Sequence, residues 1–257
     1  MRELSVREWE RYRRQIQIPG FGEEGQRKLK GASALVSRVG GLGGPAALYL
    51  AMAGIGRLVI AHGGLLTESN LNRQILMRAD HVGKPHIECA TELFARLAPE
   101  VEVIAIGEDV NEARALSLVQ QVDVVCDCAP SFEERFALNR ACVRLGRPMV
   151  EAAMYGMEGH LTTILPGKTP CLECLVPDRP NWWQVLGFPV LGAVSATLGC
   201  LAAVEAIKLI TGCGPLLAGQ LLVLDTRAMD FSKYRVHRRP DCPICGGLPD
   251  AGDAGQG

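Results

Sequence analysis

The chain has 257 residues, a formal net charge of −1 and an apolar fraction of 48%. This charge gives no electrostatic case for a nucleic-acid partner or an anionic membrane, and the length is ample for a core without disulfides. The first 14 residues carry charges throughout, unlike a signal peptide, and no apolar stretch reaches the roughly 18 residues of a membrane span. We therefore expect a cytoplasmic protein without a membrane partner, whose ten cysteines are reduced.

Residues 1–155 alternate between helical and strand patterns. Ser5 and Glu8 form a capping box that begins an arginine-rich helix over 5–14. An apolar run over 32–39 ends in the glycine-rich turn 40–44, and a helix follows over 45–53. The alternation continues with a strand over 58–61, a helix over 84–97, a strand over 101–106, a helix near 111–120, a strand over 122–127, a helix over 132–145 and a strand over 148–153. This order predicts a Rossmann-like α/β fold, with a mostly parallel sheet and helices on both faces.

The rhythm changes after residue 155. An alternating strand over 158–165 precedes a loop over 177–189 and a nearly all-apolar helix over 191–211, and a strand pair follows from 221 to about 235. We expect residues 156–246 to form a smaller region with antiparallel strands, packed on the nucleotide-binding region of residues 1–155 as one continuous domain. The tail 247–257 has the composition of a disordered segment.

Four cysteines form two Cys-x-x-Cys pairs, Cys171 with Cys174 and Cys242 with Cys245. This spacing lets both sulfurs of a pair reach one tetrahedral ion, and four thiolates leave no open coordination position. The pattern therefore predicts a structural zinc ion. The alternative is four unrelated core thiols or a redox dithiol, but redox motifs occur singly. The other six cysteines lie in helix or strand patterns and are expected to be buried.

The glycine-rich turn 40–44 lies where a nucleotide-binding fold needs residues without a Cβ atom, so that phosphates approach the backbone and a helix N-terminus. The usual G-x-G-x-x-G pattern would begin at position 38, where this chain has Arg38. A dinucleotide site also needs a carboxylate at the end of the second strand, and the segment 61–64 has none. Both departures argue against a NAD-dependent dehydrogenase.

The segment 69–74, SNLNRQ, follows the second predicted strand. It lies near the carboxyl edge of the predicted sheet, so Asn70 and Arg73 are expected where a phosphate chain would bind. A solvated loop with local side-chain turns is the alternative. For Arg11, Arg13 and Arg14 in the first helix, an exposed helix face is the default interpretation.

Several motifs occur in consistent order between about residue 9 and residue 246: RYRRQI at 11–16, the glycine turn, SNLNRQ at 69–74, GKP at 83–85, Asp127-Cys128 and the two cysteine pairs. Together they resemble the HesA/MoeB/ThiF family, the bacterial relatives of ubiquitin-activating enzymes. The segments 39–44, 63–64, 127–129 and 151–154 are most similar to the HesA branch, which is associated with nitrogen-fixation gene clusters.

The resemblance implies an enzyme that uses ATP and Mg²⁺ to adenylate the C-terminal glycine of a small ubiquitin-like sulfur-carrier protein. A carboxylate attacks the α-phosphorus and pyrophosphate leaves, so the protein positions the reactants and neutralises charge. A homodimer is also implied, because Arg14 resembles an arginine that reaches the partner subunit's ATP. The catalytic residues that the resemblance implies are Arg14 and Arg73. Its nucleotide-binding residues are Gly41, Gly43, Asn70, Arg73, Gln74, Lys84 and Asp127.

The sequence departs from the family pattern around the expected nucleotide. His62 stands where the family has an aspartate for the ribose, with Gly64 at a second acidic position. His86 replaces the phosphate-binding lysine, although Lys84 lies two residues earlier, and Pro130 replaces the magnesium-binding aspartate. Such losses typically slow a phosphoryl-type transfer. The replacement groups in reach are Asp127, Glu133 or Glu134 for the metal and Arg38 for the lysine charge.

Two functions follow from these residues. The first is a weakened or re-tooled adenylyltransferase that acts on a ubiquitin-like sulfur carrier, in a pathway for sulfur or metal cofactors. The second is a binding module that docks such a carrier without turning over ATP, and the departures at His62, His86 and Pro130 favour it. No cysteine lies in 177–190, so no thioester transfer by this chain is expected.

Overall fold

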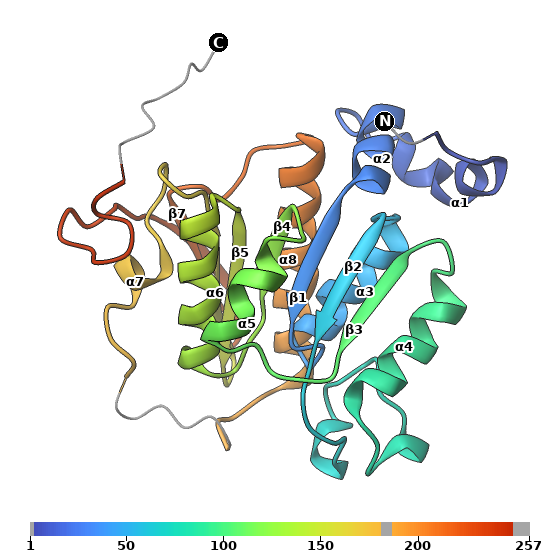
Figure 1. Ribbon diagram of the computed structural model, residues 1–257, viewed down its shortest axis with the longest axis horizontal. Coiled ribbons are helices and arrows are strands. Elements are labelled where there is room, and N and C mark those ends of the chain that lie inside the picture. Colours follow the sequence, from blue (N-terminus) through green and yellow to red (C-terminus); the bar gives the residue numbers. More distant parts are fainter. Residues whose placement is uncertain (1–2, 181–186, 249–257) are drawn as a thin grey trace.

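The computed structural model describes residues 3–180 and 187–248, and their strands form one mixed sheet with helices on both faces (Figure 1). The strand order is β3-β2-β1-β4-β5-β6-β7-β8. Strands β3 to β5 in this order are parallel, and β6, β7 and β8 continue the same sheet as antiparallel neighbours. The predicted Rossmann-like, mostly parallel fold with antiparallel strands after it is therefore confirmed.

The elements follow the predicted order closely. The strands are β1 (Ser33–Ser37), β2 (Arg57–Ala61), β3 (Glu102–Ile106), β4 (Val124–Asp127), β5 (Met149–Tyr155), β6 (Glu158–Ile164), β7 (Gln220–Asp225) and β8 (Asp230–Arg235). The helices are α1 (Val6–Ile16), α2 (Gly22–Gly31), α3 (Gly43–Ala53), α4 (His86–Leu97), α5 (Glu112–Val119), α6 (Phe132–Leu145), α7 (Leu172–Leu175) and α8 (Gly192–Thr211). Two 3-10 turns, η1 (Glu68–Asn70) and η2 (Ala79–His81), lie between β2 and α4.

The predicted boundary between the two regions falls at a turn, and parts of two predicted segments lie outside the described residues. The expected boundary after residue 155 coincides with the turn between β5 and β6, so the sheet runs unbroken across it. Residues 181–186 of the predicted loop and 249–257 of the predicted tail lie outside the described residues.

Helix α2 was not predicted from the sequence, because it lacks an apolar period. Its buried residues are Gly25, Gln26 and Leu29, of which only Leu29 is a large hydrophobe. Gln26 replaces apolar packing with hydrogen bonds, since its Nε2 donates to the carbonyl of Ala53 at 2.9 Å. The first helix, by contrast, begins as expected, with Ser5 and Glu8 forming a reciprocal capping box.

The core is divided by the sheet into two apolar layers. One layer packs β1, β2, β5 and β6 against α3, α4 and α8, and includes Leu50, Phe94 and Leu198. The other packs the opposite face of the sheet against α5 and α6, and includes Leu35 and Leu138. Strand β1 is buried along its whole length, as expected for a central parallel strand covered on both faces.

Helix α8 is long and apolar enough to cross a membrane by length and composition, contrary to the sequence expectation that no segment reaches that length. In the structure it packs against α3 and the sheet instead, and Leu198 and Ala202 are fully buried. Its buried Glu205 accepts hydrogen bonds from the Thr163 hydroxyl at 2.6 Å and the Leu217 N–H at 3.0 Å. These contacts are those of an interior helix of a folded domain.

One glycine lets α8 approach the loop after β1. A Cβ atom on Gly199 would lie 2.1 Å from the carbonyl oxygen of Leu42, just before α3. Only a residue without a side chain permits this distance, so Gly199 fixes how closely α8 covers the glycine-rich turn. The turn is thereby held between β1 and α8.

Candidate functional site

A cavity of about 500 Å³ opens at the carboxyl edge of the parallel strands. Its wall comes from the segments that follow β1, β2 and β4, from the SNLNRQ loop and from the start of α8. The chain leaves β1 toward β2 on one side and returns to β4 on the other, so the strand order reverses at this point. Open α/β sheets bind ligands at such a switch point, in the crevice between the diverging loops.

Backbone atoms of the glycine-rich turn 40–44 form part of the cavity wall. Arg38 has a φ of +68°, in the left-handed region that a side chain disfavours, and Gly40 and Gly41 line the cavity after it. A Cβ atom on Gly43 would lie 1.9 Å from the Arg38 carbonyl oxygen, and one on Gly41 would lie 2.9 Å from the Ser195 Oγ. Helix α3 begins here without a side-chain cap, so its first N–H groups can receive an anion.

The SNLNRQ loop supplies polar side chains on the other side. The Asn70 side chain caps the turn η1, where its Oδ1 accepts the Thr67 N–H at 2.9 Å. Arg73 donates to the Ser69 carbonyl at 2.7 Å and to the Asn72 Oδ1 at 2.8 Å, and both acceptors are neutral. Asn70, Arg73 and Gln74 all line the cavity.

Arg38 lines the cavity but is already paired. It forms ion pairs with Asp109 at 2.7 Å and with Glu134 at 2.8 Å. Burial raises the pKa of Glu134, and the Arg38 charge opposes that rise. The Asp109 carboxylate also accepts the Gly63 N–H at 2.8 Å. Through Asp109, Arg38 therefore connects the turn after β1 with the loops after β2 and β3.

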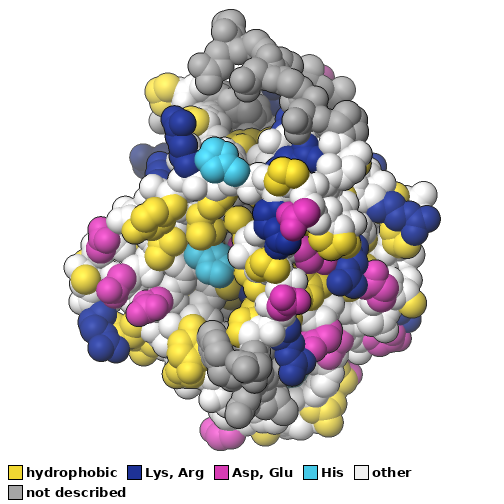
Figure 2. All heavy atoms as spheres, turned by 90° about the vertical axis from the view of Figure 1, so that its left-hand side faces the viewer, with side chains coloured by type: hydrophobic (Ala, Val, Ile, Leu, Met, Phe, Trp, Pro, Cys, Tyr) yellow, Lys and Arg dark blue, Asp and Glu magenta, His cyan; other side chains and the backbone are white. Residues whose placement is uncertain are grey.

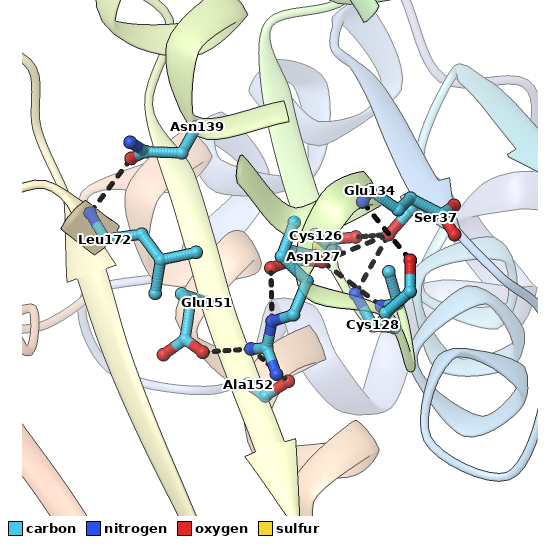
Figure 3. A network of polar contacts seen from close by, with 12 residues as sticks. Ser37, Cys126, Asp127, Cys128, Glu134, Asn139, Glu151, Ala152 and Leu172 are labelled. Atoms are coloured by element: carbon cyan, nitrogen blue, oxygen red, sulfur yellow. Dashed lines mark hydrogen bonds and ion pairs between the residues drawn. The ribbon is translucent and has the colours of Figure 1, made fainter. Parts of the chain in front are cut away.

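A buried ionic network lies beneath the cavity (Figure 3). Arg135 of α6 donates to Asp127 at 3.2 Å and also to Glu151 of β5, and both carboxylates are fully buried. Burial raises the pKa of Asp127, whereas His160 and Arg135 outweigh the burial of Glu151 and lower its pKa. Asp127 also accepts the Ala129 N–H at 3.1 Å, so it holds the loop after β4 and Arg135 together.

Among the residues that the structure describes, Arg73 is therefore the only cavity-lining arginine without a carboxylate partner. Arg38 and Arg135 each face two carboxylates, so their charges are largely neutralised. No Asp or Glu of the described chain lines the cavity. The electrostatic potential of the cavity thus favours an anion, with Arg73 as its main counter-charge.

His62 and His86 form a stacked pair at the end of β2. Their ring centroids lie 4.0 Å apart and the rings are within 7° of parallel. Burial, the neighbouring His86 and the Arg38 charge lower the pKa of His62 to about 2, and burial also lowers the pKa of His86. The Nδ1 atom of His86 lies 3.1 Å from the carbonyl oxygen of Gly64. Both rings therefore remain neutral, and they add no positive charge for a phosphate.

The sequence-derived nucleotide residues are distributed unevenly around this cavity. Gly41, Asn70, Arg73 and Gln74 line it, and so does Pro130. The remaining three lie elsewhere: Gly43 behind the turn, Lys84 exposed and outside the lining, and Asp127 buried beneath Arg135.

Some residues of the site were not singled out from the sequence. Arg135 and Ser195 line the cavity from α6 and α8, far along the chain from the glycine turn. Neither belongs to a motif with a spacing that would reveal it. Arg14 lies exposed on α1 and is not among the lining residues of its own chain.

The four cysteines of the two pairs converge on one point. Their Sγ atoms all lie within 4.8 Å of one another, and all four residues are buried. The Sγ distances are 4.0 Å for Cys171–Cys174, 3.7 Å for Cys171–Cys242 and 3.3 Å for Cys174–Cys245. Tetrahedral zinc with Zn–S bonds of about 2.3 Å requires S···S distances of about 3.8 Å, so the cluster could hold a metal ion such as zinc.

Burial raises the pKa of Cys171 and raises that of Cys174 to about 11, and hydrogen bonds around the cluster oppose this effect. The Arg239 N–H donates to the Cys174 Sγ at 3.4 Å. Burial opposes ionisation of Cys242, but the N–H groups of Cys245 and Ile244 outweigh it and lower its pKa to about 7. Backbone donors of this kind orient and stabilise the sulfurs of a thiolate–metal site.

Comparisons with known proteins agree with this architecture. The protein HesA of Leptolyngbya boryana is 52% identical over 246 residues, which cover 96% of this chain and 88% of HesA. The adenylyltransferase and sulfurtransferase MOCS3 of Bos taurus is 40% identical over 254 residues, so this chain matches 56% of its length. The crystal structure of E. coli MccB with MccA-N7isoASN has a TM-score of 0.82 at 24% identity, covering 95% of this chain and 76% of MccB.

A second structure of MccB, solved with ATP, has a TM-score of 0.79 at 26% identity and covers 92% of this chain and 74% of MccB. The model of the ThiF family matches residues 12–244, nearly the whole described chain. With this match and a relative above half identity, the chain belongs to the ThiF family, whose members include proteins named as adenylyltransferases.

Proposed function

We propose that the chain is an ATP-dependent adenylyltransferase that activates the C-terminal glycine of a small ubiquitin-like sulfur carrier. The observation that carries this proposal is the switch-point cavity, where an uncapped helix N-terminus and the unpaired Arg73 face the same space. The MccB structure with ATP supports ATP as the nucleotide. The likeness to HesA supports the HesA branch, and from the resemblance to that branch we propose a role in sulfur or metal-cofactor biosynthesis linked to nitrogen fixation.

The proposed reaction joins a carboxylate of the carrier to the α-phosphorus of ATP, and the bond to pyrophosphate breaks. The backbone at Gly41 and Gly43 leaves room for the phosphates beside the N-terminus of α3. Arg73 neutralises charge on the triphosphate, and Asn70 and Gln74 orient it. Lys84 and Asp127, the other two residues suggested for the nucleotide, would act only after a rearrangement that brings them to the cavity.

The cavity wall does not fit a magnesium ion held by the protein. Mg²⁺ prefers carboxylate oxygens, and no described carboxylate lines the cavity. Glu134 and Asp127 are buried and paired with Arg38 and Arg135. Positive charge for the reaction therefore comes from Arg73 in this proposal.

A second candidate function is a binding module that holds a carrier without turning over ATP. It is favoured by His62, His86 and Pro130, which all line the cavity and bring neither a cation nor a carboxylate. The two functions differ in one property, because only an adenylyltransferase exchanges pyrophosphate into ATP.

The carrier would bind to the region of residues 156–246 in either case. The hairpin β7–β8 exposes Met229, Phe231 and Tyr234, with exposed fractions of 73%, 45% and 57%. Figure 2 shows that hydrophobic, basic and acidic side chains are interspersed on the side of the molecule where the antiparallel strands lie. Such a mixed surface fits a small folded protein partner. A reducing cytoplasm is the compartment that fits the thiolate cluster.

We expect ATP–pyrophosphate exchange in the presence of a candidate sulfur carrier, and loss of exchange in Arg73→Ala. Removing the unpaired arginine weakens ATP binding by about 1.5–3 kcal/mol, the range for hydrogen bonds to charged groups. This corresponds to a loss of affinity of about 10-fold to 150-fold, which titration calorimetry measures directly.

Arg78→Ala is the matched control, because Arg78 lies in the same loop region but pairs with Asp80 and Glu92 and does not line the cavity. It should bind ATP as the unmutated chain does. ATP binding without exchange would support the binding module, and equal losses in both variants would remove the role given to Arg73.

The cysteine cluster is proposed to hold one structural zinc ion per chain, since four thiolates complete its coordination. Elemental analysis should give one zinc per chain for the unmutated protein. Cys242→Ala should lose the metal and about 4 kcal/mol or more of the free energy of unfolding. Cys213→Ala, outside the cluster, should keep both. A fully folded, metal-free protein with four reactive thiols would contradict the assignment.

We also propose a homodimer in which Arg14 completes the partner subunit's nucleotide site. Arg14 is exposed on α1 and does not reach the cavity of its own chain, so it is available to another subunit. Mixing Arg14→Ala chains with Arg73→Ala chains should restore about one competent site per mixed dimer, measured by exchange. If subunit exchange is proven and the mixture is no more active than either variant, Arg14 does not act across a dimer.

A further inference from the structure

Arg38 has a backbone conformation that a residue with a side chain rarely adopts. Its φ of +68° lies in the left-handed region, where the Cβ atom comes close to the following carbonyl oxygen. Among the described residues, only one other non-glycine residue has a positive φ, the exposed Met229 between β7 and β8. Such strain persists at functional sites when the surrounding contacts hold it. A glycine would adopt this conformation without strain, so the strain is tied to what the Arg38 side chain contacts.

The Arg38 side chain lies between two carboxylates at the wall of the cavity. Its Nε donates to the Glu134 Oε2 at 2.8 Å, and its Nη2 pairs with the Asp109 Oδ2 at 2.7 Å. The side chains of Arg38 and Glu134 are 17% and 3% exposed, so solvent screens this pair only weakly. The second pair is more open, since the Asp109 side chain is 51% exposed. One guanidinium thus neutralises a carboxylate from the loop after β3 and another from α6.

Without this guanidinium, Asp109 and Glu134 would place two negative charges beside the space proposed for the triphosphate. Arg38 and Gly63 both line the cavity, and both are bonded to these carboxylates. Two carboxylates repel a polyphosphate unless a cation lies between them. Carboxylate oxygens are also ligands that Mg²⁺ and Mn²⁺ prefer. The Arg38 guanidinium therefore occupies a position in which a divalent cation would otherwise balance the charge.

The rest of the wall offers a divalent cation no carboxylate. No described Asp or Glu lines the cavity, and Asp127 beneath it is fully buried and bonded to Arg135. The cations of the wall are the guanidinium groups of Arg38, Arg73 and Arg135, which stay charged at neutral pH. Unlike a bound metal ion, these groups are always present. The wall is therefore balanced in charge before a nucleotide arrives.

We propose that Arg38 is a resident cation, which takes the place of a divalent metal ion between Asp109 and Glu134, so that the cavity binds a nucleoside triphosphate without a metal ion held by the protein. This inference rests on the proposed ATP site and deepens it, because it names the cation that balances the wall. Free ATP carries more negative charge than its magnesium complex. A wall with an available Arg73 and no open carboxylate should therefore bind free ATP at least as well.

Titration calorimetry on the zinc-loaded, full-length protein compares ATP in metal-depleted buffer with ATP in the same buffer plus Mg²⁺. The unmutated chain should bind ATP without Mg²⁺ at an affinity that is higher than, or within about threefold of, that with Mg²⁺. A site that relied on a protein-held metal ion would instead lose affinity when the ion is withheld, because the carboxylates that hold it would face the phosphates.

Arg38→Gly should turn the site into one that needs a metal ion. Glycine accepts the left-handed conformation, so this change removes the charge without adding strain. Mn²⁺ should then bind to the freed carboxylates and lose its free electron paramagnetic resonance signal, at about pH 8 because burial raises the pKa of Glu134. The ATP affinity of this variant should rise about tenfold on adding Mg²⁺. The matched control combines Arg38→Gly with Asp109→Asn and Glu134→Gln, and it should show neither effect because no carboxylate remains.

The outcomes separate this inference from the function on which it rests. If the unmutated chain binds ATP only with Mg²⁺, the role of Arg38 is overturned and the ATP site is kept. A folded Arg38→Gly protein that binds no Mn²⁺, or a triple variant that binds it equally well, would also overturn that role. No ATP binding in either buffer would overturn the ATP site itself, and the Mn²⁺ measurement would still test Arg38. The comparison within the unmutated chain decides the question even if a variant fails to fold.

Discussion

The site depends on the reversal of strand order between β1 and β4. Because the chain leaves these two neighbouring parallel strands in opposite directions, their following loops diverge and cannot fill the space at the edge of the sheet. Backbone from the glycine turn occupies one side of this space, and the loop after β4 occupies the other. Helix α8 covers it through the close contact at Gly199. The cavity is thus a consequence of topology, and the side chains only decide what it holds.

The carboxylates next to the cavity form ion pairs with arginines and do not line the cavity. Glu134 and Asp127 are buried against Arg38 and Arg135. The first pair joins α6 to the turn after β1, and the second joins α6 to the end of β4. Removing one partner of such a buried pair leaves an uncompensated charge, so these pairs fix the walls of the cavity. Arg73, bonded only to neutral oxygens, keeps its charge available. The division between structural arginines and a free one explains why the cavity favours an anion.

The sequence was most informative where the signal is local. The spacing of Cys171 and Cys174, and of the second pair, predicted a cluster that the fold assembles from segments about seventy residues apart. The alternation of helices and strands predicted the parallel sheet, since every central strand is an apolar run. The glycine turn was recognisable from its run of glycines, and the close contacts at Gly41 and Gly43 require residues without side chains.

The features that sequence reasoning missed depend on pairing across the chain. Arg135 is unremarkable in the helical pattern of α6, and only the fold brings it between Asp127 and Glu151. The stacking of His62 on His86 joins residues on different elements, so neither position indicated a pair. Helix α2 was hidden because a hydrogen-bonded Gln26 takes the place of apolar packing.

A structure determined with bound ATP would show whether the switch-point cavity holds the nucleotide. The triphosphate is expected beside the N-terminus of α3, with a phosphate oxygen within hydrogen-bond distance of the Arg73 guanidinium. Nucleotide bound outside the switch-point cavity, or a triphosphate that leaves Arg73 bonded only to Ser69 and Asn72, would contradict it.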